Sequence, residues 1–152
     1  MVSLSTFRQD ATAINQGEWV SPGEEYGDLE ILSRGFNDAY FDLRAALERK
    51  AARRLRTDID ALPAAERRAI TVECVRKTIV LDVRNLEHDI GARKGQPVTL
   101  EEFREMLADP DLAELTVACL KAASKVGVAR KADMEEAVGN LSRPSAATST
   151  AG

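Results

Sequence analysis

The chain has 152 residues, of which 44% are hydrophobic but only 5% aromatic, and its formal net charge is −4. This length fits a single domain, and a core built from Ala, Leu, Val and Ile with few rings favours packed helices. The small negative charge gives no overall electrostatic reason to expect nucleic acid or an anionic membrane as a partner. The longest apolar runs are also far too short to span a bilayer.

Residues 1–34 differ from the rest of the chain and are expected to form a β-hairpin region. The stretches "GEWV" and "DLEILSR" carry Trp, Val and Ile, and the turn-rich "SPGEEYG" separates them. An isolated hairpin is marginal in water. We therefore expect its apolar side chains, namely Trp19, Leu29 and Ile31, to lean on the helices or on another copy of the chain.

Residues 35–142 are expected to form a helical domain of about four to five helices. The first helix is predicted from Gly35 to about Thr57, because apolar residues recur there every three or four positions. Its apolar stripe is Phe36, Tyr40, Leu43, Leu47, Ala51 and Leu55. Its other faces carry the cations Arg44, Arg49, Lys50, Arg53, Arg54 and Arg56.

A second helix is predicted over residues 63–86, because Pro63 suits a first helical turn and a new apolar pattern follows. The stripe is Val72, Val75, Ile79, Val83 and Leu86, with Ile70 and Cys74 at its flanks. The β-branched residues of "TIVLDV" leave a strand open for the last turns. The glycines and the proline of "DIGARKGQPV" then predict a loop or a small hairpin.

Two helix starts follow this loop. Thr99 and Glu102 have the spacing of a capping box, which predicts a short helix over about residues 100–108. Asp109-Pro110-Asp111 combines an N-cap acceptor with a proline suited to the first turn, which predicts another helix directly afterwards. The stripe of this last helix is Leu112, Leu115, Cys119, Ala122 and Val126.

The end of the chain changes in character. Gly127 is expected to weaken or bend the last helix before "ARKADMEEAVGNL" resumes the helical pattern. Residues 143–152 contain Ser, Thr, Ala and Pro without apolar anchors, so we predict a disordered tail.

The residues offer little catalytic or metal-binding chemistry. His88 is the only histidine and stands beside no nucleophile motif, so we interpret it as a solvated residue at a loop edge. Residues 91–95 have the glycines and cations of a phosphate loop, but Gln96-Pro97 follows where Lys and Ser or Thr should enter a helix. Cys74 and Cys119 form no CxxC pair and are expected to be reduced and buried. We predict no catalytic residue, cofactor or metal, and an enzyme is the least expected class.

Two segments are candidates for partner binding. The basic segment 44–56 is open to three interpretations: a solvated helix face, a surface for acidic protein such as residues 9–30 of another copy, or a nucleic-acid contact. Its cations spread around the helix without interleaved aromatics, which weakens the last interpretation. The short helix after Thr99 buries little by itself, so its apolar face belongs either to the core or to a partner groove. The candidate partner-binding residues are Phe103, Met106, Leu107, Arg49, Arg53 and Arg54.

Three stretches, "GFNDAYFDLRAALERKAAR", "GQPVTLEEFREMLADPDL" and "EEAVGNL", follow one another in an order that resembles a phage tail assembly chaperone of the long-tailed, non-contractile phages. Asn37 and Tyr40 match an asparagine and a following tyrosine of that family. The second stretch matches at Pro97, Thr99, Glu101, Glu102, Phe103, Leu107, Asp109 and Pro110. The likeness covers about residues 5–142. The chain departs from the pattern at Val83 and Arg84, where an aromatic is common before the glycine turn, and in the loop "NLEHDIGARKG". Near the end, where a Lys-Asn pair is usual, it has Gly139-Asn140.

The resemblance implies a protein without enzymatic activity that coats the long, helical tape measure protein during tail assembly and helps to recruit tail tube subunits. It implies self-association, action in the cytoplasm of the bacterial host, and absence from the mature virion. No apolar signal segment is seen at the N-terminus, so export is not implied. The alternatives are a small structural head-tail joining protein and a nucleic-acid-binding regulator that uses residues 44–56.

Overall fold

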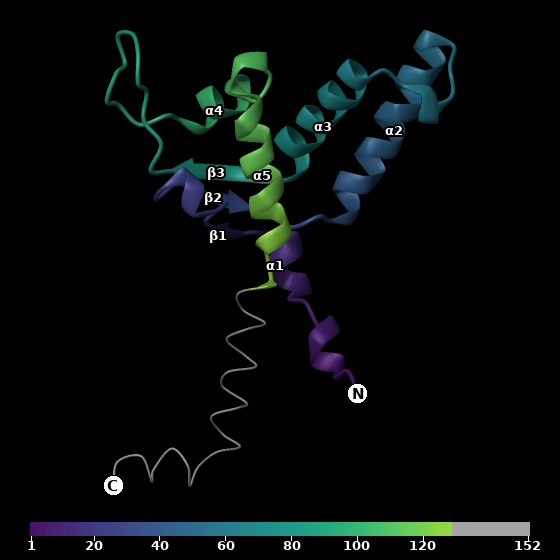
Figure 1. Cartoon of the computed structure of the whole chain (residues 1–152), viewed down its shortest axis with the longest axis horizontal. Helices are drawn as coiled ribbons and strands as arrows, with labels where there is room; N and C mark the ends of the chain where they lie inside the picture. Colours follow the sequence, from purple (N-terminus) through teal and green to yellow (C-terminus); the bar gives the residue numbers. More distant parts are fainter. Residues whose placement is uncertain (129–152) are drawn as a thin grey trace, which may run out of the picture.

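The structure is a computed structural model in which residues 1–128 are described. This part of the chain is mainly helical with a small antiparallel sheet, which confirms the predicted fold class, mainly α with a short N-terminal β-hairpin (α+β) (Figure 1). Two predictions lie outside the described residues: the helical pattern that resumes after Gly127, and the disordered tail at residues 143–152.

The N-terminal region contains the expected hairpin, preceded by two short helical segments that the sequence pattern did not predict. Its elements are the 3₁₀ helix η1 (Leu4–Phe7), α1 (Ala11–Gln16), β1 (Glu18–Val20), the 3₁₀ turn η2 (Glu24–Tyr26) and β2 (Glu30–Ser33). Strands β1 and β2 pair antiparallel. Asp10 starts α1, because its carboxylate accepts a hydrogen bond from the Ala13 backbone N–H at 3.2 Å.

A third strand, β3 (Val80–Arg84), pairs antiparallel with β2 and completes a sheet in the order β1-β2-β3. The predicted helix over residues 63–86 is therefore wrong beyond Thr78, where α3 (Ala64–Thr78) ends. The strand left open for "TIVLDV" is the one that forms. β-Branched residues suit a pleated, half-buried surface, and the free edge of β2 provides the hydrogen-bonding partners for it.

The two faces of the sheet differ: of the expected apolar side chains, Leu29 and Ile31 are buried, but Trp19 is not in the core. Ile31 is opposite Val20 on one side and Val83 on the other, and all three are buried. Trp19 instead pairs with Leu32, so it lies on the opposite face, because successive side chains of a strand alternate. There it is half-buried, and the Arg84 guanidinium lies 4.1 Å from the centre of its ring.

Helix α2 (Asp38–Leu55) and α3 form a helical hairpin through the 3₁₀ turn η3 (Ile59–Ala61), and this hairpin reaches out beyond the sheet (Figure 1). Asn37 caps α2 by accepting from the Tyr40 N–H at 3.0 Å. Of the predicted stripe, Tyr40 and Ala51 are buried and Leu43 and Leu47 are half-buried, whereas Phe36 and Leu55 are exposed at the two ends.

The remaining helices are α4 (Leu100–Met106) and α5 (Ala113–Lys125), joined by the 3₁₀ turn η4 (Pro110–Leu112). Asp109 accepts from the Asp111 N–H at 2.9 Å, so the predicted start is present, although its first turn is 3₁₀. Helix α5 runs through the middle of the molecule and contacts β2 and α3, while α4 contacts β3 (Figure 1). Cys119, Ala122 and Val126 of the predicted α5 stripe are buried in the core.

The N-terminal region holds α5 along its length. Tyr26 donates to the Glu114 carboxylate at 2.9 Å near the start of α5, and Lys125 donates to the Pro22 carbonyl at 3.0 Å at its end. Gly127, with a φ of 83°, then lets the chain leave the helix, and its N–H donates to Glu18 Oε1 at 2.7 Å. The predicted bend at this glycine is thus the end of the helix.

Candidate partner-binding surfaces

The apolar face of α4 is part of the core. Phe103 is 0% exposed and Leu107 is 2% exposed, while Met106 packs half-buried against the core. Helix α4 is tied to β3, since Arg104 donates to the Val80 carbonyl at 3.0 Å. Of the two interpretations of this face, burial in the core is correct, and Phe103 and Leu107 are not accessible to a partner.

The predicted capping box of α4 is present and belongs to a larger polar cluster. Thr99 Oγ1 accepts from the Glu102 N–H at 3.2 Å, and Glu102 Oε1 accepts from the Thr99 N–H at 3.1 Å. Arg93 also donates to Glu102 Oε1, at 2.8 Å. The backbone N–H of Thr99 is the largest cause that lowers the pKa of Glu102, followed by the Thr99 hydroxyl and by the charges of Arg93 and His88.

His88 is half-buried in this cluster, so its expected position at a solvated loop edge is wrong. Its side chain is 14% exposed, and Nε2 lies 2.9 Å from Glu102 Oε2 without the alignment of a hydrogen bond. The loop that follows is a small hairpin, in which the His88 N–H donates to the Gln96 carbonyl and the Val98 N–H donates to the Leu86 carbonyl. Glu102 thus fixes this loop against the start of α4.

The loop at residues 91–95 has the geometry of a turn. Gly91 and Gly95 have φ values of 79° and 81°, a backbone region that glycine adopts readily. The Arg93 guanidinium, which would face a phosphate in a phosphate loop, is instead directed to Glu102 and to Gln96 Oε1. At this hairpin Ile90 is an exposed apolar residue.

The arginines in the basic segment of α2 differ in whether they form ion pairs. Arg54 pairs with Glu66 of α3 at 2.7 Å, so its charge holds the helical hairpin together. Arg49 and Arg53 are exposed and form no ion pair with the described residues. Arg56 caps the helix in the left-handed region, with a φ of 52°, which favours glycine. Of the three predicted arginines, Arg49 and Arg53 remain accessible to a partner.

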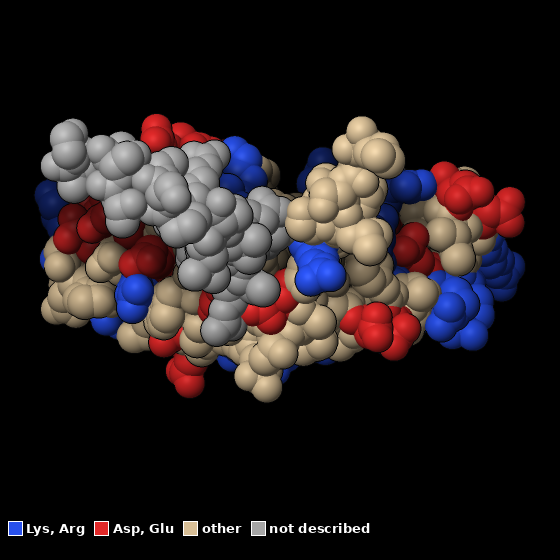
Figure 2. All heavy atoms as spheres, turned by 90° about the horizontal axis from the view of Figure 1, so that it is seen from below, with Lys and Arg blue, Asp and Glu red and all other residues tan. Residues whose placement is uncertain are grey.

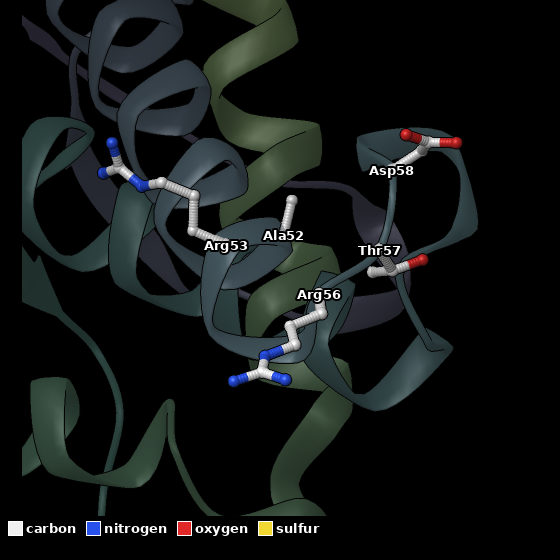
Figure 3. A pocket seen from close by; sticks show the side chains of 5 residues that line it. All are labelled: Ala52, Arg53, Arg56, Thr57 and Asp58. Carbon is white, nitrogen blue, oxygen red and sulfur yellow. The ribbon is translucent and has the colours of Figure 1, made fainter.

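A shallow, open hollow lies at this end of α2 (Figure 3). Its lining residues are Ala52, Arg53, Arg56, Thr57 and Asp58. The side chains of Arg53 and Arg56 extend in different directions from the end of the helix, and Thr57 and Asp58 lie on the loop that follows (Figure 3). The hollow therefore combines two cations and one acid around a small apolar residue.

The acidic segment 9–30 is mostly engaged within the chain. Asp10 caps α1, and Glu18 accepts from Gly127. Glu25 pairs with Lys121 at 2.8 Å, and Glu30 pairs with Arg84 at 2.9 Å. The hydrogen bond from Lys121 is the largest cause that lowers the pKa of Glu25. These acids hold α1, α5 and β3 in place, which leaves few of them to receive a basic surface of another copy.

The N-terminal arm, defined as residues 1–8, presents apolar side chains that the sequence analysis did not single out. Leu4 is 75% exposed and Phe7 is 72% exposed, and η1 buries no residue. Figure 1 shows the arm leaving the body below α1, and Figure 2 shows it from below as a largely uncharged projection. The available signal was the spacing of Leu4 and Phe7, three residues apart just before the cap Asp10.

Exposed aromatic rings stand at the start of α2 and just before it. Phe36 and Phe41 both lie edge-on to the buried ring of Tyr40, at centroid distances of 5.1 Å and 5.3 Å, and Phe41 is 52% exposed. Gly35 packs closely on Ile14 of α1, and its N–H donates to the Ile14 carbonyl at 3.0 Å. Helix α1 therefore connects the arm to this aromatic group.

Within residues 1–128, no group of three or more His, Cys, Asp or Glu residues is placed to hold a metal ion. None of the described helices has both the length and the apolar character needed to cross a membrane. Cys74 and Cys119 are free and buried as expected, and burial raises the pKa of the Cys119 thiol to about 12. Comparison with protein-family models, curated proteins and solved structures gave no match.

Proposed function

We propose that this protein is a phage tail assembly chaperone that covers the tape measure protein and helps to recruit tail tube subunits. The observation that carries the proposal is the exposure of apolar side chains on the N-terminal arm and around the start of α2. The sequence resemblance between Asn37 and Pro110 supports the same function. On this proposal the protein acts in the host cytoplasm and is absent from the mature virion.

The physical argument starts from the partner. A long helical protein that is later enclosed in a tube has an apolar stripe without cover before the tube forms, and such a stripe aggregates. Leu4, Phe7 and Phe41 are apolar side chains that can dock on a helix stripe with the usual spacing of three to four residues. Many weak contacts along one polymer together give firm binding that remains reversible.

The proposed contact residues differ from those that the sequence analysis selected. Phe103 and Leu107 are in the core, so α4 serves to position the hairpin at residues 86–98 and not to dock a partner. Arg49 and Arg53 remain available for acidic groups. We therefore assign the contact with the apolar stripe of the tape measure protein to the N-terminal arm and to Phe36 and Phe41.

The test is co-expression of the chain with the tape measure protein of the same phage genome, followed by co-purification and measurement of affinity. The variant Leu4→Ser/Phe7→Ser should bind roughly tenfold to hundredfold more weakly, because it removes two large apolar groups from the contact. Ile90→Ser is the matched control, since it replaces an equally exposed apolar residue elsewhere. A wild-type chain that does not bind the tape measure protein would refute the proposal.

Two alternatives give different results. A head-tail joining protein would be found in purified particles, whereas a chaperone leaves before the tail is finished. A nucleic-acid-binding regulator is favoured by Arg49, Arg53 and Arg56, which have no ion pair among the described residues, but Asp38 and Asp42 on the same helix oppose a run of phosphate contacts. A salt-dependent shift of DNA at sub-micromolar protein would favour this alternative.

A further inference from the structure

The solvent face of α2 carries its charges in two blocks. Asp38 and Asp42 occupy the first half of this face, and Arg49 and Arg53 occupy the second. At 3.6 residues per turn these positions fall opposite the buried Tyr40 and Ala51. All four side chains are exposed and form no ion pair with residues 1–128. Figure 2 shows separate acidic and basic groups at the end of the molecule with the α2–α3 hairpin.

The stability of the isolated helix does not explain this arrangement. The helix dipole favours an acid in the first turn and a cation in the last, which accounts for Asp38 and Arg53, but its effect does not extend to Asp42 and Arg49. Asp38 and Asp42 are like charges four residues apart, and so are Arg49 and Arg53. Both pairs are unfavourable within one helix. Apart from the dipole effect at Asp38 and Arg53, the helix itself therefore does not favour this pattern, which fits a charged surface of another molecule.

The surface that complements this face is the same face of a second copy, turned end to end. Ala45 and Ala46 lie at the midpoint, because Asp42 and Arg49 are equally far from them along the helix, as are Asp38 and Arg53. Reversal about this midpoint places each aspartate opposite an arginine of the other copy. The two alanines meet at the centre, where small side chains allow a close approach. A parallel pair would instead place like charges together.

We propose that two copies of the chain associate through α2 as an antiparallel, two-fold symmetric helix pair, centred on Ala45 and Ala46. Figure 1 shows α2 on the outer side of α3, and its main contacts are with α3 and η3. The earlier alternative, the acidic segment 9–30 of another copy, is less suitable because Asp10, Glu18, Glu25 and Glu30 are already engaged. The inference does not depend on the proposed chaperone function.

The association should be weak and concentration-dependent. Helix α2 has 18 residues, which corresponds to a length of about 27 Å. A single helix pair of this length buries less than the roughly 1,000 Å² of a stable specific interface. Exposed ion pairs are also screened by salt, so the dimer should dissociate more readily at high ionic strength.

Sedimentation equilibrium of the full chain over a wide concentration range tests the charge pairing. Arg49→Glu/Arg53→Glu and Asp38→Lys/Asp42→Lys should each weaken self-association roughly tenfold or more, because like charges then face each other. An equimolar mixture of the two variants should recover association, since an acidic face then meets a basic face. These positions are exposed, and circular dichroism checks that each variant is folded. A monomeric wild-type chain, or variants that associate like the wild type, would overturn the proposal.

Disulfide formation tests the orientation. In an antiparallel pair, Ala46→Cys places two thiols beside the two-fold axis, and oxidation should give a covalent dimer. Ala39→Cys is the matched control: it is exposed on the same helix, but the two copies of residue 39 lie roughly 20 Å apart, far beyond disulfide reach. Cys74 and Cys119 are buried and can be retained. Equal crosslinking of both variants, or none of either, would overturn the antiparallel pair.

Discussion

Helix α4 and the N-terminal arm are both short helical segments with two large apolar side chains three or four residues apart, yet one is buried and the other is exposed. Phe103 and Leu107 of α4 lie in the core, whereas Leu4 and Phe7 of the arm face solvent. Helix α4 has a capping box at its start and a strand to lie on, whereas η1 starts at Ser3, whose hydroxyl accepts from the Ser5 N–H at 3.3 Å, and buries none of its residues. Apolar spacing thus identifies a face, but the surface available beneath it determines whether the face is buried.

The largest effect on the free energy of unfolding is expected when the aromatic ring of Phe103 in α4 is removed. Phe103→Ala leaves a cavity in a fully buried site, so we expect a loss of about 3–5 kcal/mol in the free energy of unfolding. Urea denaturation followed by circular dichroism measures this loss. A decrease below about 1 kcal/mol would mean that α4 is not packed as described.

The second-largest difference is expected when the helix cap of each segment is removed. Thr99→Ala removes the hydroxyl that accepts from the Glu102 N–H, and the free energy of unfolding should fall by about 1 kcal/mol. Ser3→Ala is the matched change in the arm and should have no measurable effect, because η1 buries no residue. Equal losses in the two variants would show that the arm is docked in solution.

The charge of Glu102 should make the α4 cap dependent on pH. The pKa of Glu102 in the folded protein is below its ordinary value, so its stabilising contribution is complete above the ordinary glutamate pKa of about 4.3. The contribution is lost as the pH falls through the lower pKa of the folded state. Glu102→Gln should therefore be less stable than the wild type at pH 7, and the difference should shrink towards acid pH. Denaturation curves of the wild type and of Glu102→Gln, measured from pH 7 to acid pH, show how the free energy of unfolding of each protein changes with pH. A difference that is constant with pH would mean that the carboxylate does not act through its charge.

The smallest effect is expected for the ring of the arm. Phe7→Ala should change the free energy of unfolding by less than about 0.5 kcal/mol, since its side chain is 72% exposed. The same denaturation assay provides the comparison with Phe103→Ala. A large loss would show that Phe7 packs against the body.

The local signals that the sequence predicted correctly are those that involve near neighbours in the chain. Thr99 and Glu102, three residues apart, form the capping box, and Asp109 caps the segment that begins at Pro110. These contacts depend on backbone geometry within one turn, which the residue types largely determine. The buried stripe of α5 followed from helical spacing for the same reason.

The features that were missed depend on contacts distant in the sequence. Residues 79–86 fit helical spacing, and only pairing with β2 makes β3 a strand. Trp19 was assigned to the core face because the register with Leu32 was unknown, and His88 was expected in solvent because its contact with Glu102 depends on how the loop folds back. The left-handed backbone of Arg56 was equally unpredictable, since glycine is the usual residue in that conformation.

The hydrogen bond from Gly127 to Glu18 has a consequence for the order of folding. It joins residues that are 109 positions apart in the sequence. The nearby hydrogen bond from Lys125 to Pro22 spans 103 positions. Closing such long loops is entropically costly and tends to slow folding. On the ribosome, the contact between β1 and the end of α5 therefore cannot form until nearly the whole described chain has emerged.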